Sequence, residues 1–181
     1  NLAFAEGDLA YAPTYGNLGD SLYHMKDYRA AAGYYRKFIA IWVREHGPAH
    51  PSLHNAYAVL AAIAEADQKI TEAVDFYDRA IAVLESDLEK WHVSAVDYLQ
   101  RQRKLMLQFG FLEAAEKRLR RELELRQTYM RNDTAALAKG YHDLSTLVRD
   151  QGRPQEALPI LHYAQLLTQL SGHSSTKDTV S

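Results

Sequence analysis

Residues 15–38 read YGNLGDSLYHMKDYRAAAGYYRKF, and residues 57–80, which lie 42 positions further on, read YAVLAAIAEADQKITEAVDFYDRA. In the earlier segment, apolar or small residues recur at the spacing of one helical face: Tyr15, Leu18, Gly19 and Leu22. After Lys26-Asp27 a second stripe of this kind follows, made of Tyr28, Ala31, Tyr35 and Phe38. The segment therefore predicts two α-helices joined by a short connection.

The same two stripes recur along the chain at a period of 42 residues. Adding 42 once, twice and three times to the eight positions gives three further sets. The second is Tyr57, Leu60, Ala61, Ala64, Ile70, Ala73, Tyr77 and Ala80; the third is Leu99, Gln102, Arg103, Met106, Leu112, Ala115, Leu119 and Glu122; the fourth is Tyr141, Leu144, Ser145, Val148, Pro154, Ala157, Leu161 and Ala164. One helix pair has too small an apolar face to stand alone, so neighbouring pairs must stack. The period predicts an all-α array of about four helix pairs.

The third set departs from the pattern, because Gln102, Arg103 and Glu122 stand where the other sets have apolar or small residues. Two explanations are open. Either the helices of this pair are splayed at these positions, or the long side chains reach out of a shallow interface into solvent. In the fourth set, Pro154 falls at the first turn of a helix, where proline is tolerated.

The composition excludes several classes of protein. With 47% hydrophobic residues the 181-residue chain is too apolar for a disordered protein, and with 21 basic against 23 acidic residues it lacks the basic footprint of a nucleic-acid binder. The absence of cysteine excludes disulfide bonds, thiol nucleophiles and cysteine-ligated metals. The longest apolar run, residues 56–64, is far shorter than the roughly 20 residues of a membrane-spanning helix. We expect a soluble protein without nucleic-acid or membrane partners, and we assign it to the cytoplasm by default.

The first helix pair resembles the tetratricopeptide repeat, whose pattern has a bulky aromatic residue, Leu-Gly, a tyrosine and a later alanine. The matching residues are Tyr15, Leu18, Gly19, Tyr28, Ala31 and Tyr35. The period exceeds the family's usual value of about 34 residues by about two helical turns, and it is similar to the longer repeats of kinesin light chains. The stretch EHGPAHP at residues 45–51 is similar to the loop that closes those repeats. The resemblance implies a right-handed superhelical array, or α-solenoid, that binds other proteins.

The resemblance covers residues 12–170, which we expect to form one repeat array. Before it, residues 1–11 are expected to hold the end of a preceding repeat, a helix stop at Glu6-Gly7 and a linker. After it, residues 171–181 are rich in Ser, Thr and Gly and poor in apolar residues, which predicts a flexible C-terminal tail.

Sequence motifs for catalysis and metal binding are absent. His46, His50 and His54 are spaced by four, which on a helix would align three metal ligands. Glycine and proline between them interrupt any such helix, so we place these histidines in a loop between repeats. The sequence also lacks a zinc-protease His-Glu pair, a phosphate-binding glycine-rich loop and a Gly-x-Ser-x-Gly nucleophile elbow. We therefore predict no enzyme activity, no metal site and no cofactor.

The remaining candidate site is the concave groove lined by the first helices of stacked pairs, where ligands usually lie in this family. The candidate groove residues are Asn17, Asp20, Tyr23 and His24 in the first pair, Asn55, Val59 and Glu65 in the second, Arg101 and Lys104 in the third, and Lys139, His142 and Arg149 in the fourth. Their order predicts a charge direction, from acidic and aromatic through small and apolar to basic. A peptide or partner helix could place apolar side chains at the centre and acidic groups toward the basic end. The alternative is an ordinary solvated surface.

The leading functional hypothesis is a non-enzymatic scaffold or adaptor that binds a protein or peptide ligand in this groove. The alternative is a regulatory sensor region of a larger protein, in which a peptide or a small effector changes the pitch of the array and thereby an attached domain. A third hypothesis is self-association through the exposed end helices, because a repeat array needs polar caps.

Overall fold

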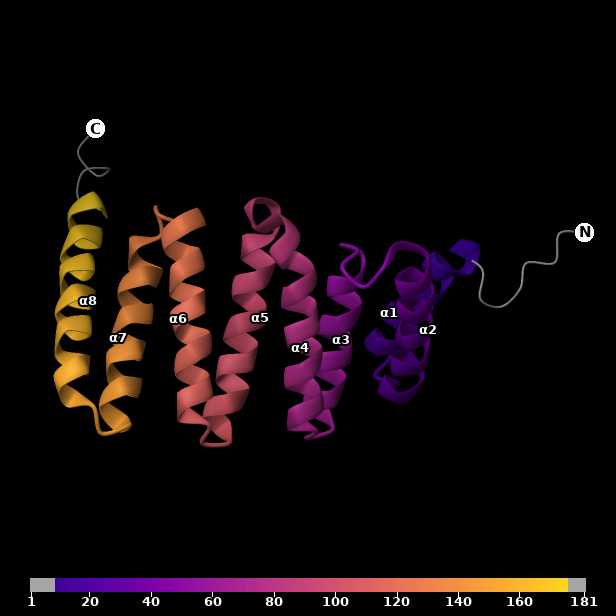
Figure 1. Ribbon diagram of the computed structural model, residues 1–181, viewed down its shortest axis with the longest axis horizontal. Helices are drawn as coiled ribbons and strands as arrows, with labels where there is room; N and C mark the ends of the chain where they lie inside the picture. The colour runs from indigo at the N-terminus through magenta and orange to yellow at the C-terminus, as the bar shows by residue number, and fades with distance from the viewer. Residues whose placement is uncertain (1–8, 176–181) are drawn as a thin grey trace, which may run out of the picture. The chain divides into compact units, whose positions relative to one another are not determined.

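The fold is all-α throughout the part of the chain that the structure describes (Figure 1). The computed structural model describes the backbone of residues 9–175 and the side chains of residues 9–171. Within this range the elements are η1 (Leu9–Tyr11), α1 (Ala12–His24), α2 (Tyr28–His46), α3 (Leu53–Ala66), α4 (Ile70–Leu84), η2 (Glu85–Asp87), α5 (Leu88–Gln108), α6 (Leu112–Tyr129), α7 (Thr134–Asp150) and α8 (Pro154–Ser175). We call the successive pairs α1–α2, α3–α4, α5–α6 and α7–α8 repeats 1 to 4. The predicted all-α array of about four helix pairs is confirmed.

The chain divides into two compact units, Asn1–Trp91 and His92–Ser181, which we call the N-terminal and the C-terminal unit. Repeats 1 and 2 lie in the N-terminal unit, whose core joins Ala31, Ala32 and Tyr35 of α2 to Ala56, Leu60 and Ile63 of α3. Most of repeat 3 and all of repeat 4 lie in the C-terminal unit. Its fully or almost fully buried side chains include Leu119 and Leu123 of α6 and Leu144 and Val148 of α7. In each unit the buried residues belong to the predicted stripes or flank them.

The same tight turn joins the two helices of every repeat. One residue in each turn has a positive φ angle: Lys26 at 65°, Gln68 at 59°, Gly110 at 74° and Gly152 at 78°. The amide of the next residue, which is Asp27, Lys69, Phe111 or Arg153, donates to the carbonyl five residues back at 2.8 to 3.2 Å. This pattern is the Schellman ending of a helix, which satisfies carbonyl groups that the last turn leaves open. Since the four turns lie 42 residues apart, the period is a property of the backbone as well as of the side chains.

Of the residues that depart from the pattern in repeat 3, Gln102 and Glu122 are buried and Arg103 is half-buried, so the prediction that their side chains reach into solvent is wrong. Gln102 is fully buried and Glu122 is 3% exposed. The Glu122 carboxylate accepts hydrogen bonds from Gln100 Nε2 at 2.7 Å and from Arg126 Nε at 3.0 Å. Arg103 Nε lies 3.5 Å from the same carboxylate. Charge pairing between α5 and α6 therefore replaces apolar contacts that the other repeats make at these positions.

The start and the end of α8 can be compared with two predicted boundaries. Pro154 is the first residue of α8, as its tolerance in a first helical turn predicts. The helix continues to Ser175, so the predicted tail boundary at residue 171 is five residues too early. The rest of that tail, residues 176–181, lies outside the described residues, as do the helix end expected before residue 6 and the stop at Glu6-Gly7.

Replacing Gly140 on α7 tests how closely α6 and α7 must pack. A Cβ atom at Gly140 would lie 2.6 Å from Leu123 Cδ2 on α6, which is too close for two carbon atoms. We expect Gly140→Ala to lower the free energy of unfolding, measured by urea denaturation, by about 1–3 kcal/mol. The matched control is Gly33→Ala on α2, where an added Cβ meets no atom within 4 Å. This control should gain about 0.5–1 kcal/mol, because alanine favours a helix over glycine. A stabilised Gly140→Ala variant would contradict the close packing.

Candidate functional site

In the N-terminal unit, the predicted groove residues lie on the solvent-facing sides of α1 and α3. Asn17, Asp20, Tyr23 and His24 come from α1, and Asn55, Val59 and Glu65 come from α3. Tyr23, Val59 and Glu65 are half-buried, and the other four are exposed. Tyr23 and Glu65 are 42 positions apart, as are Asn17 and Val59, so each pair occupies equivalent positions on the two first helices. The structure therefore presents these side chains on equivalent faces.

Tyrosines from the second helices hold the two carboxylates of this face. The Tyr35 hydroxyl donates to Asp20 Oδ1, and the Tyr77 hydroxyl donates to Glu65 Oε2 at 3.4 Å. Burial raises the pKa of Tyr35, and the hydrogen bond and the charge of Asp20 raise it further. Tyr35 therefore keeps its proton at neutral pH and orients Asp20 against the helix pair.

In the C-terminal unit, the predicted groove residues are all exposed, but a carboxylate neutralises only some of them. They are Arg101 and Lys104 on α5 and Lys139, His142 and Arg149 on α7. Arg101 Nε lies 2.9 Å from an Asp97 oxygen, and an Arg149 nitrogen lies 3.1 Å from an Asp150 oxygen. Lys104 and Lys139 have no ion-pair partner within residues 9–171. The two lysines are therefore the predicted cations whose charge remains available to a ligand.

A hollow of about 640 Å³ lies along the solvent-facing side of α5, and its lining residues are Gln100, Arg103, Lys104, Leu107 and Gln108. Leu107 is 39% exposed, so the hollow places an apolar surface beside the Lys104 ammonium group. Sequence reasoning missed Leu107. The signal that could have found it is its spacing of three residues from Lys104, which places both side chains on one side of a helix.

Arg103 forms the inner wall of this hollow and was not predicted as a site residue. Its Nε lies 3.5 Å from Glu122 of α6, and its Nη1 lies 3.5 Å from Asp143 of α7. The side chain is 19% exposed. Because two carboxylates from different helices hold it, Arg103 fixes the wall of the hollow.

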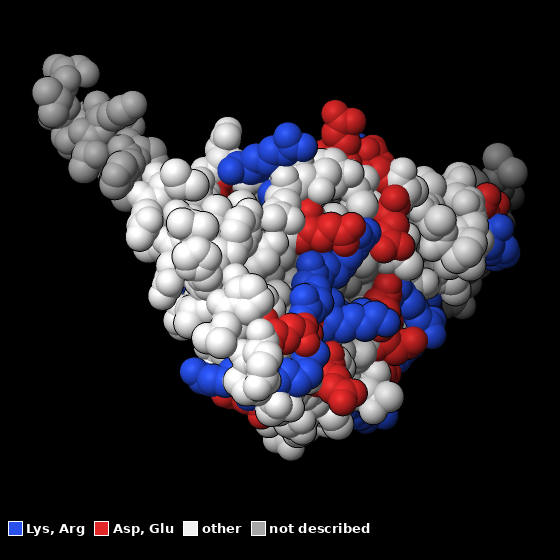
Figure 2. Space-filling model, turned by 60° about the vertical axis from the view of Figure 1, so that its left-hand side comes forward, with Lys and Arg blue, Asp and Glu red and all other residues white. Residues whose placement is uncertain are grey.

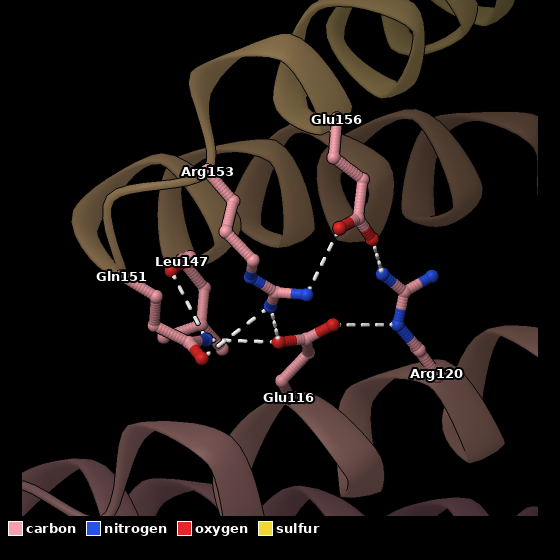
Figure 3. Close-up of polar contacts among 6 residues, drawn as sticks. All are labelled: Glu116, Arg120, Leu147, Gln151, Arg153 and Glu156. Carbon is pink, nitrogen blue, oxygen red and sulfur yellow. Dashed lines mark hydrogen bonds and ion pairs between the residues drawn. The ribbon is translucent and has the colours of Figure 1, made fainter.

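A second polar cluster joins α6 to the turn before α8 and to the first turn of α8 (Figure 3). Glu116 accepts hydrogen bonds from Arg120 Nε at 2.7 Å and from Gln151 Nε2 at 2.9 Å, and it also pairs with Arg153. Glu156 accepts from Arg120 at 2.7 Å and from Arg153 at 2.9 Å. Figure 2 shows Lys and Arg interleaved with Asp and Glu on the face that it presents. Within this cluster each charge already has an opposite charge beside it.

The N-terminal unit contains an ion pair at the equivalent place. Arg36 of α2 and Glu72 of α4 precede Arg120 and Glu156 by 84 positions, and their nearest nitrogen and oxygen lie 3.4 Å apart. Each pair links the second helices of two consecutive repeats. Arg36 and Glu72 line an open pocket of about 420 Å³, and Glu116 and Arg153 line another of about 760 Å³. A feature that recurs with the period belongs to the stacking of repeats, so we assign these pairs a structural role.

Of the three histidines predicted to lie in a loop, only His50 does so, because His46 is the last residue of α2 and His54 belongs to the first turn of α3. All three pack against tryptophans. The rings of His46 and His50 lie 4.8 and 4.5 Å from the Trp42 ring, measured between centroids, and His54 lies 4.9 Å from Trp91. Burial lowers the pKa of His54. Within the described part of the chain, no group of three or more His, Cys, Asp or Glu is placed to hold a metal ion. None of the described helices is long and apolar enough to cross a membrane.

Comparison with solved structures finds the same fold in several proteins. The nearly identical kinesin light chain TPR-like repeats of Podosopora anserina share 16% sequence identity with a TM-score of 0.68, over 93% of this chain and 80% of that one. BtubC (BKLC) from P. vanneervenii shares 19% identity with a TM-score of 0.67, over 95% of this chain and 68% of that one. The apo form of RapI shares 14% identity with a TM-score of 0.61, over 94% of this chain and 60% of that one. No curated protein sequence matches the chain.

Helix pairs that stack at a fixed period define the class of all-α repeat proteins. Residues 10–86 match the model of the tetratricopeptide repeat family. Repeats 3 and 4 continue the same period and the same turn geometry. Repeats 1 and 2 therefore match the tetratricopeptide repeat family, and the chain as a whole resembles the kinesin light chain TPR-like repeats in its fold. Repeats of this family are protein-interaction scaffolds, and the fold is generally not catalytic.

Replacing Glu122 tests whether the buried charges of repeat 3 stabilise the fold. Glu122→Gln leaves the Arg103 and Arg126 side chains, which are 19% and 11% exposed, facing a neutral group. We expect the free energy of unfolding in urea to fall by about 3 kcal/mol, because both arginines lose their shared buried carboxylate and keep only the more exposed Asp143 and Asp133. The control is Glu124→Gln on the same helix, where the Glu124 side chain is 63% exposed. It should change stability by less than about 1 kcal/mol. Equal losses in the two variants would refute the stabilising role.

The Glu116 cluster predicts a pH dependence of stability. Burial by itself raises the pKa of Glu116, but hydrogen bonds from Arg120 and Gln151 and the arginine charges outweigh it and hold this pKa below its usual value of 4.5. A carboxyl group whose pKa is lowered by folding stabilises the protein above its unfolded pKa, and this stabilisation is lost as the pH falls through the folded pKa. Glu116→Gln should therefore lower Tm at neutral pH and show a smaller decline in acid than the parent.

The control for Glu116 is Glu113→Gln, because Glu113 is an exposed residue of the same helix. Thermal unfolding followed at neutral pH and at several acidic pH values checks both variants. If Glu116→Gln kept the full acid decline of the parent, the cluster would not be the source of that pH dependence.

Proposed function

We propose that the chain is a non-enzymatic scaffold or adaptor, and that the solvent-facing sides of its first helices bind a segment of another protein. The observation that carries the proposal is that Lys104 and Lys139 have no carboxylate beside them in the described part of the chain. The charges between second helices are matched in pairs instead. A ligand therefore gains new ion pairs on the first helices without breaking the contacts that hold the repeats together.

The C-terminal unit offers a surface for an acidic and apolar segment. Lys104 borders the hollow on α5, and the half-exposed Leu107 lines the same hollow. Lys139 on α7 is 42 positions after Asp97 on α5, so equivalent positions of the two first helices carry opposite charges. Arg101 contributes less to ligand binding than the lysines do, because Asp97 already faces it. An exposed ion pair of this kind contributes little to stability, so Arg101 can exchange Asp97 for a ligand carboxylate. The ligand that fits carries carboxylates next to an aliphatic side chain.

The N-terminal unit offers a face of opposite character. Asp20 and Glu65 place carboxylates on it, and Tyr23 and Val59 place apolar surface beside them. The Tyr23 ring is held against Tyr28 at 5.4 Å between centroids, so it is ordered before a ligand binds. This face suits a segment that places a basic group beside an apolar side chain. Charge complementarity of this kind sets the orientation and the association rate of a ligand more than its affinity.

A regulatory sensor region of a larger protein is the second candidate function. Aspartyl phosphate phosphatase F from Bacillus subtilis shares 17% identity and a TM-score of 0.60, over 90% of this chain but only 41% of that one. In that protein the shared fold is therefore one part of a longer chain. A peptide or small effector on the first helices would then change how an attached domain is presented.

Charge reversal of the two lysines tests the proposed ligand face. The probes are a short fluorescent peptide of Glu, Ser and Leu residues and its counterpart with Lys in place of Glu. The parent chain should bind the acidic probe more tightly, and the double variant Lys104→Glu, Lys139→Glu should weaken this binding at least about tenfold, or about 1.4 kcal/mol. Fluorescence anisotropy measures both affinities. Added salt should weaken the parent's binding, because the contacts are exposed.

The matched control is Arg149→Glu, which reverses a cation that already has Asp150 beside it. It should weaken binding of the acidic probe by less than about threefold, since the exposed pair holds part of the arginine's charge. Circular dichroism should show unchanged helicity in every variant. Equal binding of the acidic probe by the parent and the double variant would contradict the assignment of this face.

A further inference from the structure

The last helix, α8, differs from the other second helices in having almost no charge. Between Ala157 and Ser175 it contains no Lys, Arg, Asp or Glu, and its one such residue is Glu156 in the first turn. Helices α2, α4 and α6, which hold the same place in repeats 1 to 3, each carry at least four charged residues. Contiguous apolar patches on the surface of a folded protein often mark interaction sites.

Comparison of equivalent positions, 42 residues apart, shows which positions of α8 lack the charge that the other second helices carry. The positions of Pro159, Tyr163, Leu166 and Leu170 are occupied in repeat 1 by Gly33, Lys37, Ala40 and Arg44, in repeat 2 by Asp75, Arg79, Ala82 and Ser86, and in repeat 3 by Lys117, Arg121, Glu124 and Thr128. All twelve of these residues are exposed or half-buried, and they are charged, polar or small. Apolar side chains replace them only in repeat 4. The replacement lies on a face that solvent covers in the other repeats.

These four residues form one stripe along the helix. Their spacing of four, three and four residues keeps them on one side of α8 over about 16 Å. Tyr163, Leu166 and Leu170 are 42%, 43% and 64% exposed. The Tyr163 ring meets the Tyr141 ring of α7 edge-on at 4.8 Å between centroids, so one end of the stripe is anchored. Alternating spacings of four and three are the pattern by which two helices interlock side by side.

A further tetratricopeptide repeat packed on α8 would not cover this stripe. In repeat 1, Ala32 and Ile39 of α2 pack in the core that α2 shares with α3. The equivalent residues of α8 are Leu158 and Gln165, and Gln165 is an exposed polar side chain. The side of α8 that faces a following repeat therefore lacks an apolar residue at the position of Ile39. The stripe lies on a different side and needs a partner of another kind.

We propose that the stripe of Pro159, Tyr163, Leu166 and Leu170 docks on the same stripe of a second copy of this chain. Glu156, which flanks the stripe at its start, already pairs with Arg120 and Arg153. The other polar residues that flank it are uncharged: Gln155, His162 and Gln169. A charged partner helix would find no opposite charge on these flanks. A second α8 meets no like charge there, and glutamine amides both donate and accept hydrogen bonds, so two copies satisfy each other. The contact is a two-fold symmetric pairing of identical patches.

The surface area that the stripe can cover determines the expected affinity of this dimer. A standard stable interface covers about 800 Å² on each partner, and one seam of four side chains covers less than that. We therefore expect a dissociation constant of roughly 1–100 µM. This contact goes beyond the proposed function, because it uses α8 and leaves the first helices open to a ligand.

Sedimentation velocity of the whole chain from about 1 to 500 µM tests the proposal across the expected range. The parent should pass from monomer to dimer as its concentration rises. The double variant Leu166→Glu, Leu170→Glu should stay monomeric throughout with unchanged helicity, since both side chains are exposed. The control Gln165→Glu, which adds a charge outside the stripe, should still dimerise. A monomeric parent at every concentration, or a dimer that survives the double variant, would overturn the proposal.

Cysteine cross-linking gives a second measurement that does not depend on disrupting the contact. The chain contains no cysteine, so a single introduced thiol reports on one position. Leu166→Cys treated with a short bismaleimide at dimer-forming concentration should yield a cross-linked dimer. Glu124→Cys, the equivalent position on α6, should yield far less. Equal yields from the two variants would count against pairing through α8.

Discussion

The tight turn inside each helix pair is the constraint on which the rest of the structure depends. At residues 26, 68, 110 and 152 the backbone is left-handed, and the next amide closes the first helix by bonding five residues back. This geometry fixes how the second helix leaves the first, and therefore which residues of the two helices meet. Lys26 and Gln68 adopt a conformation that disfavours side-chain-bearing residues by about 1–2 kcal/mol, so the packing of the helices outweighs the local preference.

The helix pairs could be predicted from the sequence because their apolar stripes recur at a constant period, and burial of a stripe follows directly from helical spacing. Tyr35 and Tyr77, which were predicted from the period, are both buried. The turns at Lys26 and Gln68 carry no glycine and give no such indication of their left-handed backbone. The burial of Glu122 could not be predicted either, because it depends on contacts with Arg103 and Gln100 of another helix.

The candidate site was predictable to the extent that exposure follows helical spacing. Every predicted groove residue is exposed or half-buried. The pairing of Arg101 with Asp97 also follows from spacing, since residues four apart on a helix are neighbours. The contact of Arg103 with Asp143 joins two helices and has no counterpart in local sequence. Only the structure therefore separates Lys104 and Lys139, which keep an available charge, from the arginines whose charge is already matched.

The two helices of a repeat differ in how their charges are used: the lysines proposed to bind a ligand lie on first helices, and paired charges join consecutive second helices. Resonance-by-resonance NMR mapping tests this division most directly, with backbone amide shifts followed as the acidic peptide of Glu, Ser and Leu is added to the isotope-labelled chain. We expect the largest shifts in the C-terminal unit on α5 and α7, around Lys104, Leu107 and Lys139. Shifts concentrated on α6 or α8, or spread evenly over the unit, would contradict this division.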